Sequence, residues 1–251
     1  MATIHARRVA ALYDIHGNLP ALEAALDAAD AAGADTILVG GDVVLGPMPR
    51  ETIDRLLAMG GRAHFVRGNC DRLVVDAFDG RELPAKLPPI VREQLAWSAA
   101  QLDRDGRDFL AALPQTLTLS VRGLGEVLFC HATPRSDEEI FTALTPAERV
   151  RPMLAGATPP VVVCGHTHMQ FDRAVDGVRV VNAGSVGMPF APPGAYWLLL
   201  GPGVELTRTA YDLDRAAARV RATAYPHPDE ILRPYTADQA LALFEPRPAT
   251  P

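Results

Sequence analysis

The stretch RVAALYDIHGNLPALEAALDAADAAGADTILVGGD, residues 8–42, decides the fold. Its apolar run Arg8–Tyr13 predicts a buried strand, and a second apolar run, Thr36–Val39, predicts another. Between them, apolar residues recur at the spacing of one helix face: Leu19, Leu22, Leu26 and Ala29. A strand–helix–strand unit is nearly always right-handed with parallel strands, so the chain begins as an α/β protein.

Beyond this unit the pattern changes along the chain. Strand–helix alternation continues with a predicted helix at Pro49–Met59 and a third strand at Ala63–Val66. The second half carries turn signals such as Asp176-Gly177, which is among the strongest two-residue hairpin signals. Three hairpins are predicted, with strands at Thr116–Val121 and Glu126–Cys130, Phe171–Val175 and Val178–Val181, and Ala195–Leu200 and Val204–Thr209. Two stacked mixed sheets with helices on their outer faces satisfy both halves, so we predict an α/β fold.

A stretch at about residues 83–113, which contains several prolines, interrupts the alternation of strands and helices. Its later part has helical character, and we predict a helical cap insertion there, beside the site. The chain has 251 residues, and single cores stop growing near about 250–300 residues. We therefore predict a single domain over residues 1–251, with a disordered, proline-rich tail at 245–251.

The composition of the chain argues against several classes of protein. The formal net charge is −6, which argues against a stable nucleic-acid complex, because proteins of that class carry a basic surface. Three cysteines with no CxxC pair indicate reduced thiols rather than a disulfide framework. No apolar run reaches the roughly 18–20 residues of a membrane span, and the N-terminus lacks the features of a secretory signal. These features predict a cytoplasmic protein without membrane association.

Residues with metal-binding side chains follow successive apolar runs. Asp14 and His16 close the first run, Asp42 closes the second after two glycines, and Asn69 follows the third. The remaining candidates are histidines after later strands: His131, His166 and His168. Ligand sites of α/β sheets gather at such strand ends, so these oxygen and nitrogen donors predict one shared site.

Each block taken alone has a structural explanation. Asp14 fits an Asx turn, Asp42 a glycine turn with a capping aspartate, and Asn69 a left-handed turn. A lone histidine such as His131 is more often a core residue than a ligand. The joint occurrence of the blocks, each after an apolar strand, favours a site for two metal ions. With Asp14 and Asp42 as its only anionic ligands, such a site keeps about two units of positive charge, which attract a phosphate.

Together the blocks resemble the signature of the calcineurin-like metallophosphoesterase superfamily. The matching residues are Asp14-x-His16, Gly41-Asp42, Gly68-Asn69, His131 and Gly165-His166-Thr167-His168. The small-residue segment Asn182–Gly187 also resembles the bacterial and archaeal phosphodiesterase-like branch. The resemblance implies a four-layer α/β/β/α sandwich.

The resemblance also implies a role for each block. The implied ligands of the first metal are Asp14, His16, Asp42 and His168. The implied ligands of the second metal are Asp42, Asn69, His131 and His166. A water or hydroxide bridging the two ions would be the nucleophile, and Asp42, Asn69 and His131 would be the catalytic residues. These donors suit manganese, iron or zinc, and manganese is the metal we expect to support activity in vitro.

Two positions beside Asn69 bear on the substrate. Many family members have a histidine after the Gly-Asn pair, where it acts on the leaving group, whereas this chain has Cys70. A thiol is a poor general acid near neutral pH, which counts against activity on alkyl phosphomonoesters. Arg67 either matches an arginine that contacts phosphate in the protein-phosphatase branch or is a surface arginine. The predicted substrate-binding residues are therefore Arg67, Asn69 and Cys70.

These observations predict a metal-dependent phosphoesterase that hydrolyses a small phosphodiester or nucleotide. One alternative is a protein serine/threonine phosphatase or phosphomonoesterase, which shares the metal chemistry and differs in access to the site. Another is a non-catalytic metal-binding scaffold, although scaffolds usually lose ligands that this chain retains. The sequence leaves the oligomeric state open, a homodimer included.

Overall fold

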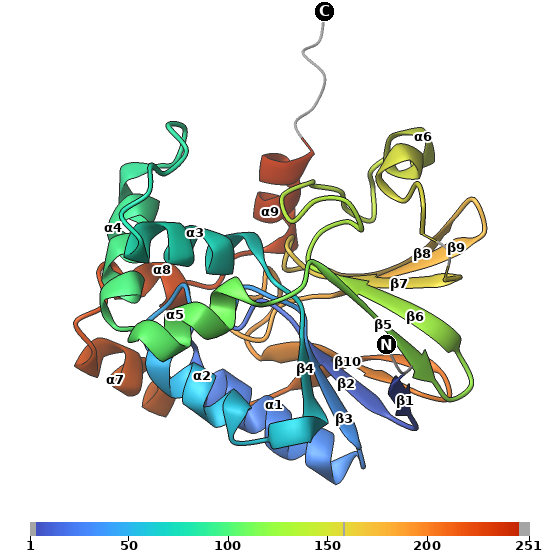
Figure 1. Ribbon diagram of the computed structural model, residues 1–251, viewed down its shortest axis with the longest axis horizontal. Helices are drawn as coiled ribbons and strands as arrows, with labels where there is room; N and C mark the ends of the chain where they lie inside the picture. Colours follow the sequence, from blue (N-terminus) through green and yellow to red (C-terminus); the bar gives the residue numbers. More distant parts are fainter. Residues whose placement is uncertain (1–3, 158, 246–251) are drawn as a thin grey trace, which may run out of the picture.

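The computed structural model describes residues 4–157 and 159–245, which form two stacked β-sheets with helices outside them (Figure 1). The first, called here the β2 sheet, has the strand order β11 (Val204–Thr209), β10 (Ala195–Leu200), β2 (Val9–Leu12), β3 (Thr36–Val39) and β4 (Ala63–Phe65). The second, called the β7 sheet, has the order β1 (Ile4–Ala6), β5 (Thr116–Val121), β6 (Gly125–Cys130), β7 (Val161–Cys164), β9 (Val178–Ala183) and β8 (Gln170–Val175). Both sheets are mixed, and each has three adjacent parallel strands, which are β2, β3 and β4 in one and β6, β7 and β9 in the other.

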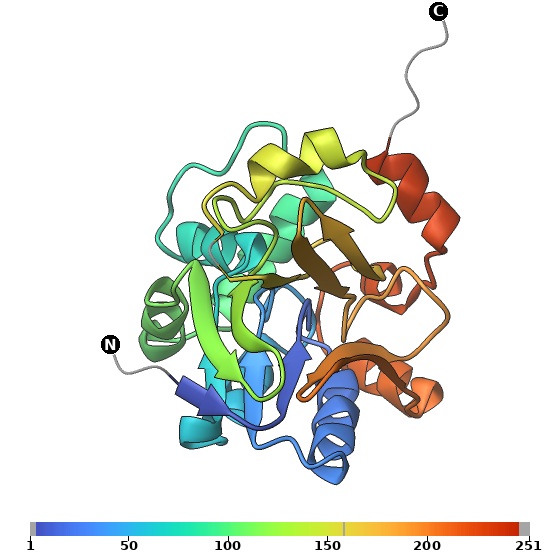
Figure 2. The ribbon, with the colours of Figure 1, turned by 90° about the vertical axis from the view of Figure 1, so that its right-hand side faces the viewer.

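Helices cover the outer face of each sheet. Their bounds are α1 (Leu19–Ala31), α2 (Pro49–Leu57), α3 (Asn69–Phe78), α4 (Pro89–Ala100), α5 (Arg104–Ala111), α6 (Ala147–Val150), α7 (Leu213–Ala222), α8 (Pro228–Leu232) and α9 (Ala237–Phe244), with 3-10 turns at Gly60–Arg62 and Arg151–Met153. Helices α1 and α2 lie along the β2 sheet, and α6 lies over β8 and β9 of the β7 sheet (Figures 1 and 2). Within residues 4–157 and 159–245, no helix combines the length and apolar character needed to cross a membrane.

Three layers of buried apolar side chains hold the two sheets and the helices together. Successive side chains of a strand point to opposite faces of its sheet, so a strand that is buried on both faces contributes to two of these layers. In β2, Ala10 and Leu12 pack among the helices, whereas Val9 and Ala11 face the β7 sheet. On the far side, Val162 of β7 belongs to the same buried cluster as residues of the α6 segment. Each sheet is thus buried on both faces, which explains the continuously apolar runs that end at the polar blocks.

This arrangement confirms the predicted α/β/β/α sandwich, and it contains the three predicted hairpins. The sequence missed β1 and also α3, the helix that begins at Asn69. Residues 83–113 contain α4 and α5, which both pack against α3, while their role as a cap over substrate stays a prediction. Of the tail predicted to be disordered, residues 246–251 lie outside the described residues. Glu245 is described, and its carboxylate accepts a hydrogen bond from Thr142 Oγ1 at 3.1 Å.

Candidate metal centre

The predicted metal ligands lie in loops at the carboxyl ends of strands from both sheets. Asp14 follows β2 and Asp42 follows β3 in one sheet, whereas His131 follows β6 and His166 follows β7 in the other. The backbone N–H of His166 donates to Asp14 Oδ2 at 2.9 Å. This hydrogen bond joins the two sheets at the point where their ligand loops meet.

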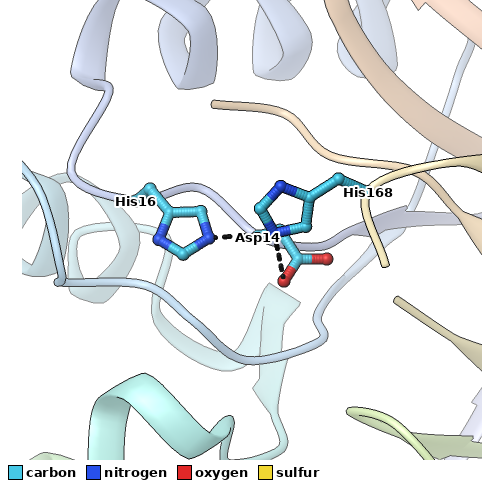
Figure 3. A group of neighbouring side chains, drawn as sticks. All are labelled: Asp14, His16 and His168. Atoms are coloured by element: carbon cyan, nitrogen blue, oxygen red, sulfur yellow. Dashed lines mark hydrogen bonds and ion pairs between the residues drawn. The ribbon is translucent and has the colours of Figure 1, made fainter. Parts of the chain in front are cut away.

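Asp14, His16 and His168 form one compact, buried group (Figure 3). Nε2 of His16 lies 3.1 Å from Nε2 of His168, which in turn lies 3.4 Å from Asp14 Oδ1. Asp14 Oδ1 is buried and has no hydrogen-bond partner among the described residues. Each side chain therefore presents one donor atom to the same small volume.

Asp42, His131 and His166 form a second group beside the first. Nε2 of His131 lies 3.4 Å from Asp42 Oδ2 and 3.0 Å from Asn69 Oδ1, so Asn69 joins this group. Asp42 Oδ2 also lies 4.0 Å from Nε2 of His16 in the first group. Asp42 therefore occupies the position between the groups, as expected for a carboxylate that bridges two ions.

The orientation of three imidazole rings fits metal binding. Nδ1 of His16, His131 and His168 faces a backbone carbonyl oxygen, respectively Leu45 O at 3.2 Å, Gly40 O at 2.9 Å and Met188 O at 2.8 Å. An N–H at Nδ1 leaves Nε2 with a free lone pair, which is the arrangement that metal-bound histidines usually adopt. In His16 and His168 two such lone pairs would face each other across 3.1 Å and repel. A cation held between them and Asp14 Oδ1 removes this repulsion, so the residues present fit a metal ion.

The predicted ligand residues hold an unusual backbone conformation. The angle φ is positive at five of them: Asp14 (53°), His16 (49°), Asp42 (53°), His166 (68°) and His168 (57°). Residues other than glycine seldom adopt this left-handed region, which costs about 1–3 kcal/mol each. Backbone strain of this kind gathers at functional sites, which agrees with a specialised role for these loops.

The charges in the site depend on one another. Burial alone would raise the pKa of Asp42, but the adjacent His131 lowers it below the ordinary value overall. Burial alone would lower the pKa of His131, but the carboxylates of Asp42 and Asp14 raise it to about 10. These two carboxylates therefore stabilise positive charge between them, whether it is carried by a proton or by a metal ion that displaces the proton.

Asp71, in the first turn of α3, supports the site and was missed by the sequence analysis. Its buried carboxylate accepts hydrogen bonds from the backbone N–H groups of Asp42 at 2.9 Å, Val43 at 2.8 Å and Gly68 at 3.0 Å. It thus holds together the loops that carry Asp42 and Asn69. Its position two residues after Asn69 was the available signal, but spacing alone does not reveal which backbone groups a carboxylate will contact.

Asp71→Asn is expected to weaken metal binding by about 10–100-fold, the range for loss of a group that orients metal ligands. Asparagine offers one acceptor oxygen, and its amide NH₂ would face a backbone N–H, so at least one of the three hydrogen bonds is lost. Calorimetric titration of metal-stripped protein with Mn²⁺ measures the change. Asp76→Asn, in the same helix but paired with Arg81, is the matched control. Unchanged affinity in Asp71→Asn would contradict the supporting role.

The predicted substrate-binding residues beside Asn69 have different surroundings. Cys70 lies at the centre, because its sulfur forms a third compact group with His16 and Asp42. Burial, together with the charge of Asp42, raises the pKa of its thiol well above the ordinary value, so this thiol is a poor proton donor. Arg67 instead lines a separate cavity and lies 3.9 Å from Asp137 Oδ2.

Comparison with known proteins agrees with this geometry. The sequence profile of the calcineurin-like phosphoesterase superfamily domain matches residues 8–200, a range that contains every predicted metal ligand. An uncharacterized protein of Methanocaldococcus jannaschii is 25% identical over an alignment 232 residues long, which covers 84% of this chain and 91% of that protein.

Solved structures share the fold over nearly their whole length. A hypothetical protein from Pyrococcus horikoshii OT3 superposes with a TM-score of 0.76 at 23% identity, covering 90% of this chain and 96% of the other. A metallophosphoesterase from Sphaerobacter thermophilus superposes with a TM-score of 0.68 at 25% identity, covering 92% of this chain and 98% of the other.

Proposed function

Because this chain belongs to the calcineurin-like phosphoesterase superfamily, we propose that it is a metal-dependent phosphoesterase acting on a small phosphodiester or nucleotide. The observation that carries the proposal is a pair of histidine nitrogens 3.1 Å apart beside a buried carboxylate oxygen, Asp14 Oδ1, with no hydrogen-bond partner among the described residues. Buried polar groups without partners are destabilising, and a metal ion bound between these atoms would supply the missing partner.

Each group would hold one divalent ion, with Asp42 shared between the two. The ligands of the first ion would also include Asp14, His16 and His168. The ligands of the second would also include Asn69, His131 and His166. When bound, the two ions would supply Lewis acidity and a nucleophilic water near neutral pH, and manganese, iron or zinc would suit these donors.

The protein's own residues orient the ligands and set the preference for a leaving group. Hydrogen bonds from Nδ1 to backbone carbonyls fix the rings of His16, His131 and His168. Cys70 stands where a proton donor would act, but its raised pKa makes it ineffective as a general acid. Esters whose leaving group is stable as an anion, such as a phenolate or a phosphate, are therefore the expected substrates.

Hydrolysis of bis-p-nitrophenyl phosphate against p-nitrophenyl phosphate tests the proposal on metal-stripped protein titrated with Mn²⁺. We expect metal-dependent turnover of the diester and little turnover of the monoester. A preference for the monoester would favour the phosphatase alternative. Two bound metals with no turnover of either compound would count against the proposal and favour the scaffold alternative.

Removing metal with a chelator is expected to lower the melting temperature, because ions that bind only the folded state stabilise it by mass action. At a free Mn²⁺ concentration of about 100 times Kd, one site adds about 2.7 kcal/mol to the free energy of unfolding. Scanning calorimetry before and after EDTA treatment measures the change, and returning Mn²⁺ is the control. Identical melting temperatures in all three states would show that the cluster binds no metal.

A further inference from the structure

We propose that an apolar pocket next to the metal centre binds an uncharged aromatic ring of the substrate. The inference rests on the proposed function only for placing the phosphate at the metals. The cavity has a volume of about 350 Å³, within the range of about 300–1,000 Å³ usual for small-molecule sites. Its walls come from the loop 187–194, from α7 and from residues 231–235.

The pocket shares residues with the supports of the first metal group. Met188 lines the pocket, and its carbonyl oxygen accepts the hydrogen bond from Nδ1 of His168 at 2.8 Å. Gly187 also lines the pocket, and its N–H donates to the backbone oxygen of Asp14 at 3.0 Å. The pocket therefore lies behind the residues that support Asp14 and His168. In this proposal the phosphate of the substrate lies at the metals and its organic part extends past these residues into the pocket.

Packed aromatic rings connect His168 with the lining of the pocket. The ring of Phe190 lies 4.9 Å from that of His168 and 5.3 Å from that of Tyr235, and Tyr235 lines the pocket. Tyr211 and Met188 add a second aromatic side chain and a polarizable sulfur to the lining. Aromatic and thioether surfaces of this kind favour a flat aromatic ring over an aliphatic chain.

The charged side chains of the lining lie outside its buried part. Its ionisable side chains other than tyrosine are Asp214, Arg221 and Arg233, all of them exposed. The buried part of the lining is mostly apolar, with Val220 and Ile231, and the polar side chain in it, Asn18, is uncharged. The occupant that fits is therefore an uncharged ring, which an aryl ester or a nucleobase can supply.

Calorimetry of the Mn²⁺-loaded protein can compare phenylphosphonate with methylphosphonate, which share the anionic group and differ in the ring. We expect phenylphosphonate to bind at least 10-fold more tightly. Ala217 in α7 lines the pocket, so Ala217→Trp should fill the pocket and remove this preference. Ala218→Trp is the matched control, because Ala218 is the next residue of the same helix and is exposed outside the lining. Ala217→Leu, a smaller change, should reduce the preference in part and remains informative if the tryptophan variant misfolds.

Two ring probes without phosphate separate failure of this inference from failure of the proposed function. Binding of benzyl alcohol and of adenosine to metal-stripped protein can be followed by NMR. Loss of either in Ala217→Trp, but not in Ala218→Trp, supports the pocket even in a protein that hydrolyses nothing, and the tighter probe tells an aryl group from a nucleobase. Equal affinity of wild-type protein for the two phosphonates, or equal loss in both tryptophan variants, would overturn the pocket and leave the phosphoesterase assignment untouched.

Discussion

Replacing Asp42 with asparagine is expected to abolish hydrolysis of bis-p-nitrophenyl phosphate while leaving the fold intact. The Asp42 carboxylate lies between the two ligand groups, with Oδ2 at 3.4 Å from His131 Nε2 and 4.0 Å from His16 Nε2. Asparagine has nearly the same shape but lacks the negative charge that a shared ligand needs. Because Asp42 would contact both ions, the loss should exceed the roughly 10–100-fold cost of removing a group that only orients ligands.

Turnover at saturating Mn²⁺ and the circular dichroism spectrum together test this expectation. Asp35→Asn is a control with the same chemical change, since Asp35 lies outside the metal groups and pairs with Arg7. A native spectrum with no turnover in Asp42→Asn, beside normal turnover in Asp35→Asn, is the expected result. Normal turnover in Asp42→Asn would refute the assignment of the metal centre.

Gly165→Ala is expected to disable the first metal group without altering any ligand. A Cβ atom at Gly165 would lie 2.5 Å from Asp14 Oδ2 and 2.5 Å from Cδ1 of Tyr13. Tyr13 is fully buried, so the carboxylate of Asp14 must shift from its position in the first metal group. We expect Mn²⁺ affinity at this group to fall more than 100-fold, with a further loss of about 1–3 kcal/mol in unfolding free energy from overpacking.

Metal titration and urea denaturation measure the two parts of this effect. Gly61→Ala is the control, because a Cβ atom at Gly61 meets nothing within 4 Å. If Gly165→Ala binds two Mn²⁺ ions as tightly as wild-type protein, the position of Asp14 is not what holds the first group together.

The strands and the order of the ligand blocks could be predicted from the sequence because both depend on local patterns. Continuous apolar runs mark strands buried on two faces, and Asp14, Asp42 and His131 each stand at the end of one. The helix at Asn69 could not be recognised in the same way, because Asn69-Cys70-Asp71 was taken as part of a ligand loop. The segment belongs to the helix and to the site at once, because Asn69 is the first residue of α3 and also a neighbour of His131.

The supports of the site could not be predicted because they depend on contacts between distant parts of the chain. The carbonyl oxygens that orient the rings of His16, His131 and His168 belong to the backbone, which carries no residue-specific signal. Phe190 packs beside His168, and Tyr235 packs on Phe190. The two residues lie in separate segments that contain several prolines, and the course of each segment follows from tertiary packing. The sequence therefore predicted the candidate ligands, which the structure brings together, but not the residues that hold them in place.

The distance along the chain between paired ligands has a consequence for biosynthesis. His16 and His168 face each other although 152 residues separate them, and the hydrogen bond from His166 to Asp14 spans the same interval. A ribosome-bound chain that has exposed only β2, β3 and β4 therefore carries Asp14 and His16 without His168, which completes their group. If the centre binds metal as proposed, loading would have to follow synthesis of the chain as far as His168 and the meeting of the two sheets, so occupancy would report that these ligand loops have come together.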